Sequence, residues 1–490
     1  MNLDTIYKGP KFDYLMLPLI MALAFYIAFI PHQNFPYPVH IDEWVHLAYS
    51  EAMLKASSTT FINPFLGQAT LSLSSNLEAG FHLFWGIFQR ISGLSWLTIF
   101  RYFPSIMFMM TVLSVYTLAR RQGFGWEAAL FACLIPTTVG ILGPAFLVPV
   151  AMGLLFLPLS LYLAFNFRSV WSYLMVLIFT SFLLSIHAPS AIAVVIVLAP
   201  CILLNLKSNF KHSLGLTMAL AIPFLALFPW IFDLVLSTAR ELLVPQPMPE
   251  YVDLPPIIAT YGYLPILFCL LGTFVLAMRG RREDYGLTLG LLAMLLMLVV
   301  FFTFHYGLYI MHQRGLMYMM LMASIVAGAG LMWVKNISLP RKVGIRLRAS
   351  LITQNIDKIL CLALVGLTLA LCIPARQSIH YYHMIDKQDY EAFVWIKDNV
   401  SDDYEKAILD PWKATAFAAI SGKHIYTRIH TAPKSSDRQA SEFLRDGCTD
   451  TGFLRENGIS IVYTRAPCQN PDLVKVRKNI YLLKEAQKGK

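Results

Sequence analysis

Two consecutive stretches near the start of the chain decide the fold: YLMLPLIMALAFYIAFI (residues 14–30) and PHQNFPYPVHIDEWVHLAYSEAMLKAS (residues 31–57). The first is an uncharged apolar run long enough to be a transmembrane helix, and no small-residue cleavage pattern follows it. The second opens with turn-forming residues and then places apolar and polar residues on different faces of a helix. We therefore expect a membrane span followed at once by an amphipathic helix on the membrane surface, with Asp42 at its start.

The composition of the whole chain agrees with a membrane protein. Of 490 residues, 57% are hydrophobic and only 14% are charged, and the mean hydropathy is +0.58. Soluble domains carry about 25% charged residues. This composition excludes an ordinary soluble protein, a disordered chain and a disulfide-rich scaffold, and it leaves the lipid bilayer as the solvent for most of the chain.

Apolar runs of suitable length predict eleven membrane spans. They lie near residues 14–30, 98–119, 126–142, 146–166, 172–187, 190–206, 213–237, 256–278, 286–305, 315–334 and 357–375. A further apolar stretch at 78–91 is better read as a juxtamembrane helix, because counting it as a span would place most basic loops on the outer side. The sequence thus predicts an α-helical polytopic membrane domain over residues 1–375.

The net charge of +10 is explained by orientation rather than by nucleic-acid binding. With eleven spans, sixteen Lys and Arg of the membrane region fall on the cytoplasmic side and five on the outer side, as the positive-inside rule requires. No basic stripe with interleaved aromatic residues appears. We expect a multi-pass protein of a prokaryotic plasma membrane, with a cytoplasmic N-terminus, an extracytoplasmic C-terminal domain and no nucleic-acid partner.

Beyond the last span, residues 376–490 alternate short strand-like and helix-like segments, which predicts a small soluble α/β domain. Helices are expected in DYEAFVWIKDN, ATAFAAISGK, SEFLRDG and TGFLRENG, and strands in KAILD, HIYT, SIVYT and NIYLLKE. Cys448 and Cys468 lie in this domain and could form a disulfide outside the cytoplasm; a pair of free thiols is the alternative.

Acidic residues gather on the expected outer side. Eight of the fourteen Asp and Glu in residues 1–375 fall there, mostly in the two long outer loops, 31–97 and 238–255. The chemistry is therefore expected in the outer loops.

This order of features resembles the GT-C glycosyltransferases, polytopic enzymes that take sugar from a polyprenyl-linked donor outside the cytoplasm. The resemblance is carried by HIDEWVHLAY (40–49), the segment 80–125, HQRGLMYMMLMASIVAGAGL (312–331) and QDYEAFVWIKDN (388–399). The resemblance extends over nearly the whole chain as a series of weak signatures. Within the family, the chain resembles the dolichyl-phosphate-mannose mannosyltransferases and the aminoarabinose transferases. This resemblance implies a catalytic acid in the first outer loop, juxtamembrane helices at 31–97 and a soluble domain after the last span.

The chain also departs from parts of the family. It lacks the WWDYG signature of oligosaccharyltransferases, and the short connections after spans three to six hold no DxD acid pair. These departures favour transfer of single sugars over a metal-dependent modification of asparagine.

The resemblance implies that Asp42 is the general base that removes the acceptor proton, with Glu43 as a second candidate. The alternative roles are structural: Asp42 would cap the helix that it starts, and Glu43 would be a helix-surface acid. Arg314, Arg101 and Arg240, expected at the outer membrane edge, are candidate ligands of the donor phosphate; snorkelling helix-end arginines are the alternative.

Substrate contacts are also predicted for His187 and His312 at outer helix ends and for Glu250 and Asp253 in the second loop; ordinary interfacial or solvated side chains are the alternative. Histidines on the outer side could join Asp42 or Glu43 around a divalent cation. No clear ligand set such as HExxH is present, so the sequence assigns no metal and no cofactor.

The sequence therefore predicts an inverting membrane glycosyltransferase whose partners are a polyprenyl-phosphate-linked sugar, an acceptor protein, lipid or glycan, and membrane lipids. Two other classes stay open. A lipid or solute transporter or flippase would be expected to show intramembrane charges in broken helices, which are scarce here. A non-catalytic subunit of an envelope-assembly complex would keep the fold and lose the activity.

Overall fold

The computed structural model describes residues 10–67, 70–72, 76–138, 140–245, 254–307, 309–336, 356–429 and 433–484. The chain forms two compact units. We call them the helical unit (residues 1–33 and 102–380) and the mixed unit (residues 34–101 and 381–490). Each unit is assembled from two separate parts of the sequence.

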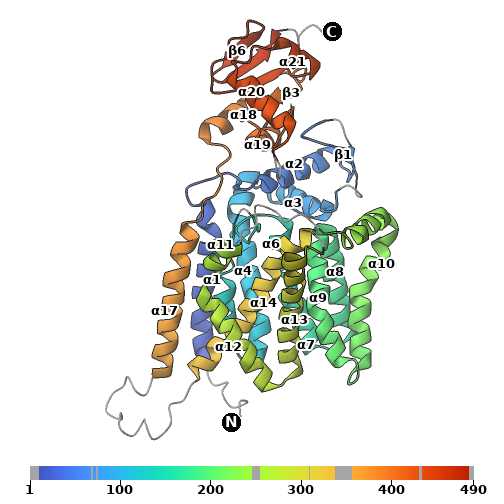
Figure 1. Cartoon of the computed structure of the whole chain (residues 1–490), viewed down its shortest axis with the longest axis vertical. Helices are drawn as coiled ribbons and strands as arrows, with labels where there is room; N and C mark the ends of the chain where they lie inside the picture. Colours follow the sequence, from blue (N-terminus) through green and yellow to red (C-terminus); the bar gives the residue numbers. More distant parts are fainter. Residues whose placement is uncertain are drawn as a thin grey trace. The chain divides into compact units, whose positions relative to one another are not determined.

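Long helices lying side by side make up the helical unit (Figure 1). Their bounds are α1 (Pro10–Phe29), η2 (Ile30–His32), α4 (Trp96–Gln122), α5 (Gly125–Ala132), α6 (Pro149–Leu154), α7 (Phe156–Asn166), α8 (Val170–Ile186), α9 (Ala188–Asn205), α10 (Phe210–Glu241), α11 (Leu254–Tyr261), α12 (Tyr263–Arg279), α13 (Arg282–Phe304), α14 (Tyr309–Lys335) and α17 (Ile356–Gln377). The first residues of α4 belong to the mixed unit.

Within the described residues, eight helices are long and apolar enough to cross a membrane, and the bent pair α11–α12 makes a ninth if it is one span. The two members of that pair are inclined by 77°. Helix α8 is apolar but has only 17 residues. The predicted class, a polytopic α-helical protein with a small α/β domain, is therefore confirmed, and ten of the eleven predicted spans coincide with these helices.

The prediction of a continuous helical span over 126–142 is wrong. Helix α5 ends at Ala132, and the chain next becomes helical at Pro149. Pro136 and Pro144 lie between these two points; a proline removes a backbone donor and disfavours a helix interior. The apolar composition that predicted a span thus belongs to a short helix followed by irregular backbone.

The described part of this irregular segment is mostly buried, and two of its carbonyl groups are paired with side chains from α17 and from the residues after α1. The Leu134 carbonyl accepts a hydrogen bond from the guanidinium of Arg376, near the end of α17. The Ala145 carbonyl lies 3.0 Å from His32 Nε2, just past the end of α1. Non-helical backbone inside a membrane protein is tolerated where it is buried in protein and satisfied in this way.

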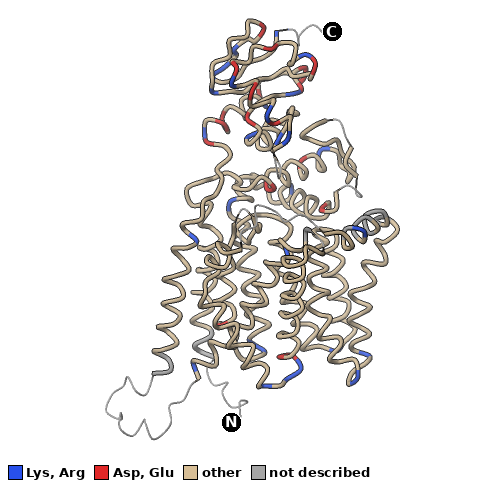
Figure 2. Tube along the Cα trace, viewed as in Figure 1, with Lys and Arg blue, Asp and Glu red and all other residues tan. Residues whose placement is uncertain are grey.

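Charges in the helical unit lie mainly near the helix ends (Figure 2). At the end marked by Lys335, which we call the Lys335 end, Lys335 pairs with buried Glu127, and Arg279 Nε lies 3.1 Å from Asp284 Oδ2. Helix α4 also finishes on basic residues. The long stretches between the helix ends are apolar, as a bilayer requires.

Glycines permit very close helix packing in this unit. A Cβ atom on Gly272 of α12 would clash with the Val326 carbonyl oxygen of α14, and one on Gly328 would lie 2.5 Å from the Ala128 nitrogen of α5. Small residues let membrane helices approach in this way and gain van der Waals contact. Helix α14 is accordingly the most buried of the candidate spans.

The first part of the mixed unit is the loop between α1 and α4. It contains α2 (Ile41–Ala56), β1 (Phe61–Ile62), β2 (Thr70–Leu71) and α3 (Ala79–Ser92), and β1 and β2 pair antiparallel. The two helices match the predicted amphipathic helix and the predicted juxtamembrane helix at 78–91. They pack against each other; Trp44 and Trp85, one from each helix, are both almost fully buried.

The second part of the mixed unit is the C-terminal domain, a mixed sheet with helices. Its elements are α18 (Lys387–Asn399), β3 (Lys406–Ile408), α19 (Ala414–Ser421), β4 (His424–Ile425), α20 (Ser435–Arg445), α21 (Thr451–Glu456), β5 (Ile461–Tyr463), β6 (Leu473–Arg477) and β7 (Ile480–Leu483). The strand order is β4-β3-β5-β7-β6; β3 is parallel to β4 and β5, and β7 is antiparallel to β5 and β6. The sequence prediction included every one of these strands except β6.

The loop and the C-terminal domain share backbone contacts. Ile425 of β4 donates its N–H to the carbonyl of Phe65 at 2.8 Å. His424 Nδ1 lies 3.2 Å from the Pro64 carbonyl, and its ring covers Gly67, where the positive φ of 69° and the contact both favour glycine. Residues 34–101 thus group with residues 381–490, whereas the sequence assigned residues 31–97 to the membrane domain.

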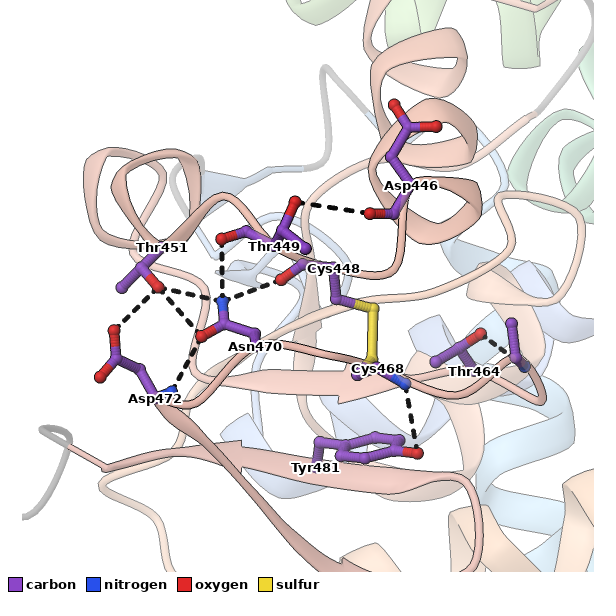
Figure 3. The surroundings of a disulfide bond; sticks show 10 residues. Asp446, Cys448, Thr449, Thr451, Thr464, Cys468, Asn470, Asp472 and Tyr481 are labelled. Carbon is purple, nitrogen blue, oxygen red and sulfur yellow. Dashed lines mark hydrogen bonds between the residues drawn. A yellow bond between two sulfur atoms is a disulfide. The ribbon is translucent and has the colours of Figure 1, made fainter.

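Cys448 and Cys468 form a disulfide in the C-terminal domain (Figure 3). The amide of Asn470 donates to the Cys448 carbonyl at 2.8 Å and to Thr451 Oγ1 at 3.0 Å beside it. Thr451 in turn donates to Asp472 at 2.9 Å. The disulfide therefore belongs to an ordered polar network that ties α21 to the segment before β6.

Candidate functional site

The start of α2 is fixed by His40 and Glu43. His40 is the N-cap, and its Nδ1 accepts the Asp42 N–H at 3.1 Å. Glu43 is fully buried, and its Oε2 accepts the N–H groups of Val39 at 2.8 Å and His40 at 3.0 Å. This reciprocal capping box satisfies donors that a helix start leaves open.

Asp42 is therefore not the cap of α2. Its side chain is 23% exposed, and one oxygen lies 3.8 Å from His40 Nδ1. The structural role that the sequence offered for Asp42 is filled by His40, whereas Glu43 performs a capping role. Of the two predicted carboxylates, Asp42 is the one with access to solvent.

Asp42, His46 and Tyr49 follow one another at helical spacing, so they form one polar stripe along α2. His46 is buried and Tyr49 is half-buried. Burial raises the pKa of the Tyr49 hydroxyl, the nearby Arg428 opposes the shift, and Glu78 adds to it. The stripe thus carries an acid, an imidazole and a neutral phenol in sequence.

Arg428 of the C-terminal domain lies against this stripe. Its guanidinium carbon is 4.1 Å from the centre of the Phe65 ring, an arrangement typical of cation–π contact. Burial lowers the pKa of Arg428, whereas the charges of Tyr49 and Asp42 raise it. Its Nη1 is buried and has no hydrogen-bond partner among the described residues. A cation from the C-terminal domain therefore faces the candidate base.

Next to the stripe, three potential metal ligands converge. They are His46 of α2, with Glu78 and His82 at the start of α3, and their ligand atoms all lie within 4.8 Å of one another. His46 Nδ1 is 2.9 Å from His82 Nε2 and 3.9 Å from Glu78 Oε2. Burial lowers the pKa of His82 well below its usual range, and the neighbouring His46 lowers it further.

The predicted histidines of the helical unit lie on two helices. His187 ends α8 and precedes α9; it is buried, and its Nδ1 is 2.6 Å from Ser190 Oγ. His312 of α14 is also buried, and its ring stacks on Phe301 at 4.2 Å with an interplanar angle of 4°.

His312 lines an apolar cavity of about 300 Å³. Ile192 of α9, Val300 of α13 and Tyr306 contribute to its walls, as does Leu242 just beyond α10. The lining is almost wholly hydrocarbon and aromatic, which suits an apolar chain better than a sugar.

The predicted arginines are divided between the two units. Arg314 is half-buried on α14, two residues after His312, and Arg240 is exposed at the end of α10. Arg101 is half-buried in α4 and is the last residue of the first part of the mixed unit.

The predicted acids Glu250 and Asp253 lie outside the described residues. Within the mixed unit, the structure brings Asp42 and Glu43 together at the start of α2.

The roles of Arg428 and Tyr49 and the grouping of His46, Glu78 and His82 were not predicted from the sequence. Residue spacing could have indicated two of the pairs: Asp42 and His46 are four residues apart, as are Glu78 and His82, so each pair shares a helix face. No local pattern marks Arg428, because more than 300 residues separate it from α2 and only the tertiary fold brings it there.

No family model and no curated protein matches the sequence. Solved structures match it over most of its length. The Archaeoglobus fulgidus oligosaccharyltransferase has a TM-score of 0.61 at 14% identity, with 93% of this chain and 70% of that chain covered. ArnT from Cupriavidus metallidurans, in a structure bound to undecaprenyl phosphate, has a TM-score of 0.57 at 13% identity. That match covers 97% of this chain and 98% of the ArnT chain.

The arabinofuranosyltransferase AftD from Mycobacteria gives a TM-score of 0.57 at 16% identity; 94% of this chain but only 37% of AftD is covered. The fold is therefore that of the GT-C glycosyltransferases, as the sequence resemblance predicts. Among these structures, ArnT is matched from end to end, so the helical and mixed units together have the extent of that protein.

Proposed function

We propose that the protein is a membrane glycosyltransferase that moves a sugar from a polyprenyl-phosphate donor to an acceptor on the extracytoplasmic side. The observation that carries the proposal is the match with ArnT, which covers both chains almost completely and includes a structure bound to undecaprenyl phosphate. A donor of this type joins a long apolar tail to an anionic head. The chain offers an apolar cavity and several arginines near helix ends.

In the proposed reaction Asp42 is the general base. Its carboxylate accepts the proton of the acceptor hydroxyl, the hydroxyl oxygen forms a bond to the anomeric carbon, and the bond between that carbon and the phosphate oxygen breaks. Polyprenyl phosphate leaves with the electron pair. One direct displacement of this kind inverts the anomeric configuration.

The surroundings of Asp42 support this role. Glu43 and His40 supply the capping hydrogen bonds of α2, and the Asp42 side chain is accessible to solvent. The attraction between Asp42 and Arg428 favours the ionised carboxylate, which is the form that a base requires. We assign Glu43 as a positioning residue, because its buried carboxylate holds the backbone that leads into α2.

The donor is proposed to use the helical unit. Its apolar tail would occupy the cavity at His312, and Arg314, two residues further along α14, would attract the phosphate. Arg240 and Arg101 are further candidates for the phosphate, because arginine binds phosphate oxygens in a bidentate manner. His187, which pairs with Ser190, is a candidate for binding the sugar of the donor.

We infer an orientation in which the Lys335 end of the helical unit faces the cytoplasm. Basic residues finish α4, α12 and α14, and this is the charge bias of cytoplasmic loops. The disulfide between Cys448 and Cys468 supports an extracytoplasmic C-terminal domain, because disulfides persist in oxidising compartments. A prokaryotic plasma membrane fits both observations.

A transporter or a non-catalytic subunit would share the fold, so the test must detect a new glycosidic bond. Purified protein in nanodiscs is incubated with a radiolabelled polyprenyl-phosphate sugar and a panel of lipid, glycan and peptide acceptors. Transfer of label, or its release to water as a slow side reaction, supports a transferase. Label that stays on the donor with every acceptor, while the lipid crosses the bilayer of sealed liposomes, would support a flippase instead.

A further inference from the structure

We propose that His46, Glu78 and His82 bind a zinc ion that joins α2 to α3. The three side chains come from two helices, and their ligand atoms lie within 4.8 Å of one another. Two imidazole nitrogens and a carboxylate oxygen form a frequent ligand set of zinc sites that keep a fourth position open. The inference does not depend on the proposed function, because zinc binding is measured without a sugar donor.

The separations fit a tetrahedral ion after a small adjustment. Zinc–nitrogen bonds of about 2.0–2.1 Å place neighbouring ligand atoms about 3.3 Å apart. The structure gives 2.9 Å between His46 Nδ1 and His82 Nε2, and 3.9 Å between His46 Nδ1 and Glu78 Oε2. These two values lie on either side of the required separation, and side-chain shifts of about half an ångström would correct both. The third pair, His82 and Glu78, has its ligand atoms within 4.8 Å of each other.

The burial of the ligands also suits a metal. His82 is almost completely buried. Its Nδ1 has no hydrogen-bond partner among the described residues. Glu78 is the residue before α3, yet its side chain makes no capping hydrogen bond to that helix. Burying these groups together is unfavourable unless a cation or hydrogen bonds compensate.

Access and position suggest what the ion does. The Glu78 side chain is 35% exposed, so ion and water can enter from its side. His46 stands one helical turn after Asp42, and a bond from zinc to His46 would restrain that face of α2. The ion would act as a clamp that holds the helix of the candidate base against α3.

The experiment measures zinc on the full-length chain without a histidine tag. Protein in nanodiscs is stripped with EDTA and titrated with zinc chloride against a chromophoric chelator, and the variants His82→Asn and Glu78→Gln are compared with His380→Asn, an exposed histidine elsewhere. We expect one zinc per chain. Loss of a supporting partner of a ligand weakens metal binding by about 10–100-fold, so loss of a ligand should weaken it by about 100-fold or more, and His380→Asn should change nothing.

X-ray absorption at the zinc edge of the wild-type protein provides a second measurement that needs no variant. It should show two imidazole nitrogens with oxygen ligands at about 2.0–2.2 Å. The proposal is overturned if the wild type binds no zinc at micromolar concentration, if the spectrum shows no imidazole, or if folded His82→Asn and Glu78→Gln bind zinc as the wild type does. His46 and His82 would then be a plain hydrogen-bonded pair.

Discussion

The guanidinium of Arg428 lies over the ring of Phe65, with 4.1 Å between its central carbon and the ring centre. Phe65 belongs to the loop between α1 and α4, and Arg428 to the C-terminal domain. The same loop residue accepts the backbone N–H of Ile425. One stacked pair and one backbone hydrogen bond thus connect two segments that are distant in sequence.

Replacing Arg428 should loosen this connection. A desolvated cation–π pair contributes about 2 kcal/mol, so Arg428→Ala should speed amide exchange of residues 61–67 by about tenfold or more. Arg428→Lys should have a smaller effect, because it keeps the charge but loses the planar stack. Hydrogen exchange followed by mass spectrometry checks this. Unchanged protection in Arg428→Ala would show that the stack contributes nothing to the connection.

Acid should destabilise the C-terminal domain through Asp386. Partial burial alone would raise its pKa, but hydrogen bonds from Arg465 and from the Asp389 N–H outweigh burial and bring the pKa to about 2. The unfolded value is about 3.9. A depressed pKa means that the carboxylate stabilises the fold fully above pH about 4, and that this stabilisation is lost as the pH falls to about 2.

The variant Asp386→Asn should therefore be less stable than the wild type at neutral pH, by up to about 1 kcal/mol because the pair is exposed. The difference should disappear near pH 2. Thermal unfolding of the purified chain between pH 2 and 7 measures this, with Asp398→Asn, an exposed acid of α18, as the control. A difference that stays constant over this range would contradict the assignment.

Breaking the disulfide should destabilise the same domain. Cys448 and Cys468 are 20 residues apart, and closing a loop of this size stabilises a domain by about 3 kcal/mol. We expect the double variant Cys448→Ser, Cys468→Ser to be cleaved by protease within residues 433–484 much faster than the wild type. Reduction of the wild type should produce the same pattern. Cys361, which is not part of a disulfide, offers a control position for serine substitution.

The close approach of α14 to α5 should depend on Gly328. A methyl group there would lie 2.5 Å from the Ala128 nitrogen and 2.6 Å from its Cα, and these atoms cannot move without displacing α5. Gly328→Ala should lower the yield of folded, monodisperse protein, with a cost of about 1–3 kcal/mol for overpacking. Gly366→Ala on α17, where a methyl group meets nothing within 4 Å, is the matched control. Size-exclusion chromatography in detergent measures both.

The sequence predicted most of the fold because the bilayer leaves few choices. An apolar run such as 286–305 must be helical to satisfy its backbone, and helix α13 covers it. The same rule failed at 126–142, where the buried segment is satisfied by Arg376 and other neighbours instead. Such compensation is a tertiary property that no local window contains. Strand β6 was missed for a related reason, since only its first residue is buried.

The candidate site was predictable only in part. Asp42 stood out through its position after the first span, and the structure adds that His40 and Glu43 carry the capping role. Arg428 comes from beyond the last helix of the membrane region, and its approach to Asp42 depends on the whole fold. The pairing of His46 with His82 likewise needs the packing of α2 on α3.

The central claim is that Asp42 removes the acceptor proton in a sugar transfer. The most direct test is the rate of label transfer from a radiolabelled polyprenyl-phosphate sugar by wild type, Asp42→Asn and the control Asp398→Asn, each in nanodiscs and with matched folding. General-base catalysis contributes about 10²–10⁴-fold, so we expect Asp42→Asn to lose about that factor in kcat while Asp398→Asn transfers at the wild-type rate. Undiminished transfer by Asp42→Asn would contradict the account.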